Sequence, residues 1–283
     1  MAARVARPIQ IVATPGSGAG RALDTARRLR EALSARGRET SLEVFSDLDG
    51  LRRWAADGPA FSLLICVGGD GTQSAAARAA MRRSVPLLPV PTGFGNLFAR
   101  QLRQPGGVRR AIDLVERGEI VRVDVGVRNG EPFLCQEGFG LLSEIQRRVE
   151  AGSRPPRPRW RRWLAYYRMA ARYFRETTPT PLRVVVDGRL LAPDAVLVVV
   201  ANVETYGAWL PLTPGASPVD GLFDIFAIRA SSKGRILARL LERHLRVPGS
   251  ARGTLHCRGR RVAIAAGRGR PEDLEVLPRA LPV

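Results

Sequence analysis

Apolar and polar positions over the first 125 residues follow two alternating periods. Short, nearly continuous apolar runs predict four strands, at 7–14, 41–45, 61–67 and 85–90. Residues 21–35 instead repeat apolar side chains about every 3.6 positions, which predicts a helix. The run at 61–67 has almost no polar position, as expected of a strand buried on both faces of a parallel sheet. Strands that alternate with helices form βαβ units, so we expect a Rossmann-like α/β domain over 1–124.

The pattern changes near residue 120, where strands joined by tight turns become common. Asn129-Gly130 and Asp187-Gly188 each lie between two apolar segments, and such dipeptides favour the type I′ turn of a hairpin. Two helices are expected in this half, at about 158–176 and 231–245. We therefore predict a C-terminal β-sandwich domain. Its range would be 125–265, with the segment 266–283 returning to the N-terminal domain.

Composition narrows the class of protein. The 283 residues are 45% hydrophobic and 25% charged, which is typical of a globular chain. Cys66, Cys135 and Cys257 lie far apart, which excludes a disulfide framework and fits a reducing compartment. No run of 18 apolar residues occurs, and the N-terminal segment has no signal-peptide core. The expectation is a cytoplasmic protein.

The charge is unusual, since Lys and Arg number 45 against 26 Asp and Glu, for a formal net charge of +19. One explanation is a compositional bias toward arginine. The other is a surface that attracts phosphates, anionic lipid or another polyanion. Nucleic acid is not the expected partner, because the arginines are scattered and no nucleic-acid-binding module is recognisable.

Three glycine-rich turns follow predicted strands at one edge of the expected sheet. They are Gly68-Gly69-Asp70-Gly71-Thr72, Thr14-Pro15-Gly16-Ser17-Gly18 and Pro91-Thr92-Gly93-Phe94-Gly95-Asn96. Glycine lets a backbone approach a ligand closely, and the amides at a helix start favour phosphate. Ligands of open α/β sheets bind at the carboxyl ends of strands, so the turns together predict a nucleotide-phosphate site. The alternative for the turn at 68–72 is a tight strand-to-helix connection in which Asp70 caps Thr72.

These motifs resemble the diacylglycerol kinase catalytic-domain family, which includes bacterial lipid kinases and sphingosine kinases and is related in fold to NAD kinases. GGDGT at 68–72 and PTGFGN at 91–96 carry the resemblance, together with PGASPVDGLFD at 214–224. The first glycine turn and Asn202, which precedes a Tyr-Gly turn, match in order and spacing. The similarity covers nearly the whole chain.

The resemblance implies that ATP binds between the two domains and that its γ-phosphoryl group passes to the hydroxyl of a diacylglycerol- or sphingoid-like lipid, with Mg²⁺. Asp70 is the candidate catalytic residue. Asp220 and the backbone carbonyl of Leu222 would match a structural Mg²⁺ loop, for which the alternative is a plain Asp-Gly turn. The implied nucleotide-binding residues are Thr14, Ser17, Gly68, Gly69, Asp70, Gly71, Thr72, Gly93 and Asn96.

The sequence also departs from the family pattern. Ala75 stands where the family usually has Glu, and Leu97 stands where it usually has Asp. The late Asp-Gly-Glu motif is missing, because residues 262–270 contain no acid; Glu272 comes slightly later. An alternative is therefore a catalytically weak member that binds nucleotide or lipid. A lesser alternative is an NAD kinase-like enzyme, although no second acidic nucleotide motif occurs between 100 and 145.

The predicted helix at 158–176 is the candidate for the membrane side. Its aromatic residues fall at helical spacing among arginines, a pattern that suits peripheral association with a lipid surface. The alternative is that the aromatic stripe packs on the sandwich. An exposed sandwich edge would also allow a homodimer. The membrane-side candidates are Trp160, Arg161, Arg162, Trp163 and Tyr167.

Overall fold

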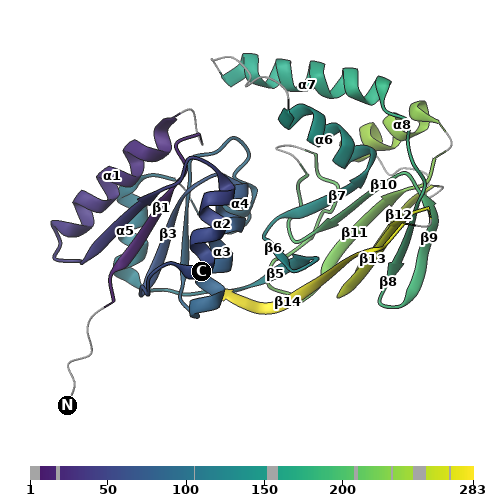
Figure 1. Cartoon of the computed structure of the whole chain (residues 1–283). Helices are drawn as coiled ribbons and strands as arrows, with labels where there is room; N and C mark the ends of the chain where they lie inside the picture. The colour runs from purple at the N-terminus through teal and green to yellow at the C-terminus, as the bar shows by residue number, and fades with distance from the viewer. Residues whose placement is uncertain are drawn as a thin grey trace.

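The computed structural model consists of two domains joined by two passages of the chain (Figure 1). It describes residues 7–16, 20–104, 106–151, 159–206, 210–230, 232–244, 253–267 and 269–283, with the side chains of 149–151 and 159–167 set aside.

The N-terminal domain contains a four-stranded parallel sheet in the order β2-β1-β3-β4. The strands are β1 (Ile9–Ala13), β2 (Thr40–Val44), β3 (Leu63–Gly68) and β4 (Leu87–Pro91). The helices are α1 (Arg21–Ser34), α2 (Leu48–Asp57), α3 (Asp70–Arg83), α4 (Leu97–Gln101) and α5 (Val108–Arg117). Side chains of α1 and α5 cover one face of the sheet, and those of α2 and α3 cover the other. This burial on both faces explains the continuous apolar runs of β1 and β3.

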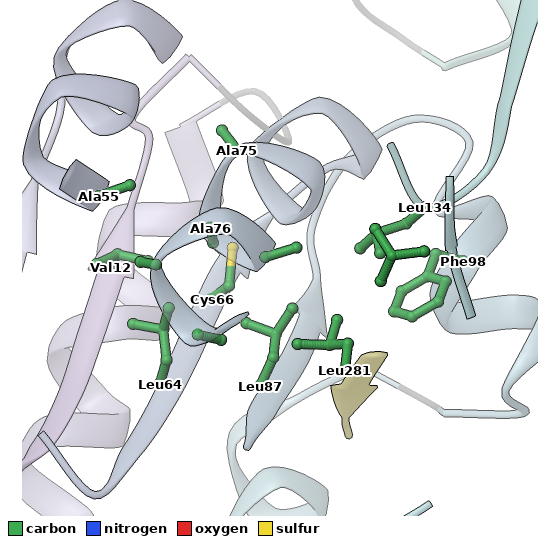
Figure 2. Close-up of a cluster of buried hydrophobic side chains, with 14 of the residues drawn as sticks. Val12, Ala55, Leu64, Cys66, Ala75, Ala76, Leu87, Phe98, Leu134 and Leu281 are labelled. Carbon is green, nitrogen blue, oxygen red and sulfur yellow. The ribbon is translucent and has the colours of Figure 1, made fainter. Parts of the chain in front are cut away.

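Figure 2 shows the second of these layers, in which the alanines of α3 pack against β1 and β3. Leu281, near the end of the chain, lies in the same cluster as Leu87 and Phe98. The backbone amides and carbonyls of Val121 and Val283 also pair with each other at 2.8 Å. The C-terminal residues therefore complete the core of the N-terminal domain.

The C-terminal domain has two antiparallel sheets, in the orders β12-β11-β10-β7 and β6-β5-β14-β13-β8-β9. Their inner faces share one apolar cluster. Three helices cover the outer face of the four-stranded sheet. The strands are β5 (Arg122–Arg128), β6 (Glu131–Phe133), β7 (Gln136–Gly140), β8 (Leu182–Val186), β9 (Arg189–Ala195), β10 (Leu197–Ala201), β11 (Phe223–Ile228), β12 (Thr254–Gly259), β13 (Arg261–Ala266) and β14 (Glu272–Pro282). The helices are α6 (Leu141–Ala151), α7 (Arg159–Glu176) and α8 (Lys233–His244).

The predicted fold class, an α/β domain followed by a β-sandwich, is confirmed. The predicted hairpins are present as β5–β6 and β8–β9, and both residues of each turn dipeptide have φ between 47° and 87°. That conformation is the one a type I′ turn requires. Both predicted helices are present, as α7 and α8, but the sequence analysis missed a third, α6. The first turn of α6 follows the strand residues of β7 without a break.

The guanidinium of Arg83, on α3, connects the C-terminal end of α2 to α3 by hydrogen bonds. Arg83 donates hydrogen bonds to the carbonyl oxygens of Ala55 (3.0 Å), Pro59 (3.0 Å) and Ala79 (3.2 Å), and it also contacts that of Gly58. These bonds satisfy carbonyls that the end of a helix leaves without partners. Burial lowers the pKa of Arg83.

We expect Arg83→Met to lower the free energy of unfolding by about 1–2 kcal/mol, because several partly buried carbonyls lose a charged donor. The guanidinium also lies over the rings of Trp54 and Phe61, at 5.9 and 5.1 Å from their centroids. Urea unfolding followed by tryptophan fluorescence measures the change. Arg82→Met is the matched control, because the neighbouring side chain is exposed. Equal effects of the two substitutions would contradict this role of Arg83.

Candidate functional site

Two of the three glycine turns lie against each other at the carboxyl edge of the parallel sheet. The Thr92 amide donates to the Gly68 carbonyl oxygen at 3.0 Å. A Cβ built on Gly93 would be 2.6 Å from the Gly69 Cα. Backbone approaches backbone here so closely that only glycine fits at position 93.

Asp70 holds this junction together from the first turn of α3. Its Oδ1 accepts a hydrogen bond from the Phe98 amide at 3.1 Å and lies 3.5 Å from the Cys135 Sγ. Asp70 thereby joins α3, α4 and the segment before β7. Burial and the neighbouring Asp70 carboxylate raise the pKa of Cys135 well above its usual range, so the thiol stays protonated and can donate.

The second carboxylate oxygen of Asp70 faces a space left by a glycine. A Cβ on Gly95 would lie 3.2 Å from Oδ2, so the missing side chain keeps that oxygen accessible. Asp70 and Gly95 both line the cleft described below. A partly exposed carboxylate beside glycine-rich turns suits a Mg²⁺ ion carried by phosphates, which takes one or two protein carboxylates. The residues present at Asp70 therefore fit a nucleotide-borne magnesium.

The glycine turn at 14–18 meets the glycine turn at 68–72 through Thr14 and Thr72. Their Oγ1 atoms are 2.9 Å apart, and both residues are buried. Thr72 also packs under Gly68, where a Cβ would lie 2.5 Å from the Thr72 Cβ. The hydrogen bond between the two hydroxyls connects the turn that begins at Thr14 to the turn that ends at Thr72. Ser17 lies outside the described residues.

Asn96 adopts a left-handed backbone conformation, with φ 51°, immediately before α4. Its Nδ2 donates to the Gly93 carbonyl at 3.0 Å and closes the turn. Its Oδ1 is buried without a hydrogen-bond partner in the described part of the chain, as is the Oε1 of Gln73. Two buried amide oxygens next to the glycine turns therefore lack a partner among the described residues.

A cleft of about 840 Å³ lies between the two domains beside these turns. Asp70 is the single carboxylate that residues 20–104 contribute to its lining, since Ala75 and Leu97 occupy the positions where acids were expected from the resemblance. Phe94, Phe133 and Tyr206 supply aromatic surface. The cleft thus combines glycines of two of the turns, Gly71 and Gly95, with aromatic surface and charged side chains.

The sandwich contributes an acidic pair that sequence reasoning did not place in the cleft. Arg128 binds Glu137 (Nη1 to Oε2, 2.6 Å) and Glu272 (Nε to Oε2, 2.5 Å), and all three line the cleft. Burial opposes the charge of Arg128, but the hydrogen bonds that it donates to the two carboxylates, together with their negative charge, outweigh burial and raise the pKa of Arg128. In the sequence, Glu272 stood out only as an acid that follows the acid-free segment 262–270. No sequence motif pointed to Glu137 as a site residue.

In the predicted magnesium loop, the Asp220 carboxylate already faces the guanidinium of an arginine, Arg258. The Asp220 Oδ1 accepts from the Leu222 amide at 3.1 Å, and the guanidinium of Arg258 lies 3.8 Å from Oδ2. Arg258 also contacts Asp224 at 3.2 Å and the Gly215 carbonyl at 3.1 Å. Among the described residues no group of three acids, histidines or cysteines could hold a metal. The residues present at Asp220 and Leu222 therefore fit a structural Mg²⁺ poorly.

The predicted membrane-side residues fall on α7, whose backbone begins at Arg159. Trp160, Arg161, Arg162, Trp163 and Tyr167 lie outside the described side chains. In the part of the chain that was searched, no helix has both the length and the apolar character needed to cross a bilayer.

The fold and this cleft define a class of two-domain protein in which an α/β domain with glycine turns faces a β-sandwich. Residues 8–127 match the family described as diacylglycerol kinase catalytic domain. Residues 139–281 match the YegS C-terminal NAD kinase beta sandwich-like domain. The chain therefore belongs to the family of proteins with the YegS C-terminal NAD kinase beta sandwich-like domain, here preceded by a diacylglycerol kinase catalytic domain.

Curated relatives agree with this membership. The chain is 28% identical over 234 residues to the diacylglycerol kinase of Mycobacterium tuberculosis (strain ATCC 25618 / H37Rv), covering 81% of this chain and 75% of that protein. It is 29% identical over 175 residues to the diacylglycerol kinase of Bacillus subtilis (strain 168), covering 61% of this chain. That second match spans 56% of the Bacillus protein, somewhat over half its length.

A solved structure shows the same fold. A diacylglycerol kinase from Bacillus anthracis strain Sterne superposes with a TM-score of 0.68 at 18% identity, covering 99% of this chain and 97% of that one.

Proposed function

We propose that this protein is an ATP-dependent lipid kinase, which transfers the γ-phosphoryl group of ATP to the hydroxyl of a diacylglycerol- or sphingoid-like lipid. The observation that carries the proposal is the Asp70 carboxylate. One of its oxygens is fixed by Phe98 and the other is left accessible by Gly95, at the edge of the interdomain cleft. The nucleotide would lie against Ser17, Gly68, Gly69, Asp70, Gly71, Gly93 and Asn96, and the buried pair Thr14 and Thr72 would support these turns.

The chemistry requires little beyond positioning and charge neutralisation. The lipid oxygen forms a bond to the γ-phosphorus, the bond from that phosphorus to the ADP oxygen breaks, and the hydroxyl proton passes to a base. Asp70 would hold the magnesium of the nucleotide, which supplies positive charge to the phosphates. The backbone of the two glycine turns would orient the phosphates, and the aromatic wall of the cleft would exclude water.

Glu137 is the proposed acceptor of the hydroxyl proton. It lies on β7, two residues after Cys135, whose thiol contacts Asp70, and both residues line the cleft. Its carboxylate is about one quarter exposed and is held by Arg128. We propose Glu137 for this role because residues 262–270 contain no acid.

We expect Glu137→Gln to lower kcat by about 10²-fold, since a positioned base typically contributes 10²–10⁴-fold. The KM for ATP should change little. Glu272→Gln is the matched comparison, because it removes a carboxylate from the same arginine, and we expect it to cost about tenfold or less. Steady-state rates of ADP release measure both variants. A larger effect at Glu272 would transfer the proposed role to that residue.

The second candidate function is binding of nucleotide or lipid with little turnover. The observation that favours it is the double ion pair of Arg128, which engages both Glu137 and Glu272. A carboxylate so engaged is a weaker proton acceptor.

Transfer of labelled phosphate from γ-labelled ATP to a panel of lipids separates these functions. We expect a radioactive product with at least one lipid that carries a free hydroxyl. No product with any lipid, together with a higher melting temperature in ATP, would establish the binding protein instead. Label in NADP when NAD is offered would indicate an NAD kinase-like activity.

A further inference from the structure

Helix α8 presents an apolar stripe to the solvent. Leu237 and Leu241 are each 48% exposed, and Gly234 and Ala238 complete the stripe at positions i, i+3, i+4 and i+7. The other side of the same helix is anchored by Ile236, which is fully buried against the sheet. A surface helix of a globular protein normally turns its one apolar stripe inward. Packing against the described residues of the domain therefore does not explain the outward stripe of α8.

The surroundings of the stripe are strongly basic. The segments that form α7 and α8 contain ten Arg or Lys residues and two Glu. Arg235 is exposed on α8, and Arg168 and Arg175 are exposed on α7. The Lys233 ammonium contacts the Arg175 carbonyl oxygen, which ties the start of α8 to the end of α7. Exposed basic side chains therefore accompany the leucine stripe on α8 and occur on α7, which packs on the same sheet.

We propose that the leucine stripe of α8 (Gly234, Leu237, Ala238 and Leu241), with the basic side chains around it, docks on an anionic lipid bilayer. Leu237 and Leu241 would enter the boundary between headgroups and acyl chains. The arginines would lie among the anionic headgroups. An apolar face bordered by Lys and Arg is the arrangement by which interfacial helices bind membranes, and each nearby cation adds to the attraction.

Docking through α8 would place against the lipid a layer of helices that also reaches the cleft. Helices α6, α7 and α8 pack as one layer on the outer face of the four-stranded sheet, along one edge of the C-terminal domain (Figure 1). Gln146 of α6 accepts a hydrogen bond from the Tyr206 hydroxyl at 3.0 Å, and both residues line the cleft. The same layer therefore carries the stripe and one rim of the cleft. To this extent the inference rests on the proposed lipid kinase function.

A second copy of the chain fits the stripe less well. A stable protein interface buries roughly 800 Å² on each partner, far more than two half-exposed leucines provide. Two such surfaces would also bring like charges together. An anionic bilayer offers both an apolar layer and the opposite charge, so the charge distribution favours it.

Sedimentation with sucrose-loaded vesicles tests the docking surface. The vesicles are phosphatidylcholine alone or phosphatidylcholine with phosphatidylglycerol. We expect the wild type to bind the anionic vesicles and to be released by high salt. Leu237→Ser/Leu241→Ser should weaken partitioning at least about fivefold, because two apolar side chains no longer insert. Ile120→Ser/Val121→Ser is the matched control, because those two apolar side chains are 55% and 56% exposed. They lie away from α8, where Val121 pairs with Val283 at the end of the chain. The control variant should bind vesicles as the wild type does.

Unchanged partitioning of the α8 double variant, or equal loss in the control, would overturn the docking surface. Sedimentation velocity without lipid would overturn it in favour of a homodimer if the wild type dimerises and the α8 variant does not. Activity on short-chain lipid in detergent micelles separates this inference from the function. A kinase that is active on micelles but does not bind vesicles contradicts only the docking surface. A protein that binds vesicles through α8 but transfers no phosphate contradicts only the function.

Discussion

Replacement of Asp70 with Asn is expected to lower kcat for phosphoryl transfer by about 10²–10³-fold, the loss seen when one preorganised electrostatic group is removed from an active site. The amide oxygen of Asn can still accept from the Phe98 amide, so the turn should keep its shape. What disappears is the negative charge on the oxygen beside Gly95, which is the single acid that the described N-terminal domain offers to the cleft. Rates of ADP release at saturating ATP and lipid measure the effect.

The matched control for this substitution is Asp57→Asn, which removes a carboxylate from an exposed position at the end of α2. We expect it to retain wild-type activity. The melting temperatures of both variants should stay within a few degrees of the wild type, so that lost activity is not lost folding. A well-folded Asp70→Asn enzyme with unchanged kcat would remove the catalytic role of Asp70 and the observation on which the proposed function depends.

The parts of the fold that the sequence predicted are those with local causes. The strand ending at Gly68 is a continuous apolar run because both of its faces are buried, and that cause is visible within six residues. The hairpin turns at Asn129-Gly130 and Asp187-Gly188 depend on a positive φ at two adjacent residues. Such signals require no knowledge of the rest of the chain.

The candidate site was predicted in outline but not in its contacts. The glycine turns at 68–72 and 91–96 do lie side by side, as their position after parallel strands suggested. The pairing of Thr14 with Thr72 could not be foreseen, because a threonine in a glycine turn looks the same whether its hydroxyl faces a phosphate or a neighbour.

The acidic pair of the sandwich was beyond sequence reasoning for a different reason. Arg128 and Glu272 are separated by 144 residues, and they meet because β5 and β14 are paired in one register. Glu137 reaches the same arginine from β7, in the other sheet. A contact that needs the register of one sheet and the packing of two has no local pattern. The outward stripe of α8 escaped notice similarly, since periodicity does not say which of two apolar sides is covered.

Replacement of Gly93 with Ala should have the largest effect on nucleotide binding. The added Cβ would lie 2.6 Å from the Gly69 Cα and 2.9 Å from the Asn96 Oδ1. The first of these atoms belongs to the backbone, so the clash is relieved only if one glycine turn moves away from the other. We expect the Kd for ATP to rise at least about tenfold, because amides and carboxylate lose their common geometry, and the melting temperature to fall by several degrees.

Gly71→Ala provides the comparison from the neighbouring turn. Its Cβ would meet only the Leu48 Cδ1, at 3.3 Å, and the end of a leucine side chain can move by a few tenths of an ångström. The two variants add the same methyl group beside the same proposed phosphate site. Only Gly93→Ala forces the two turns apart, so a difference in ATP affinity between the variants reports the displacement of the turns and not the added volume. Isothermal titration calorimetry with ATP measures both. If Gly71→Ala weakened ATP binding as much as Gly93→Ala, the close contact between the turns would not be what organises the site. If neither weakened it, ATP would bind elsewhere.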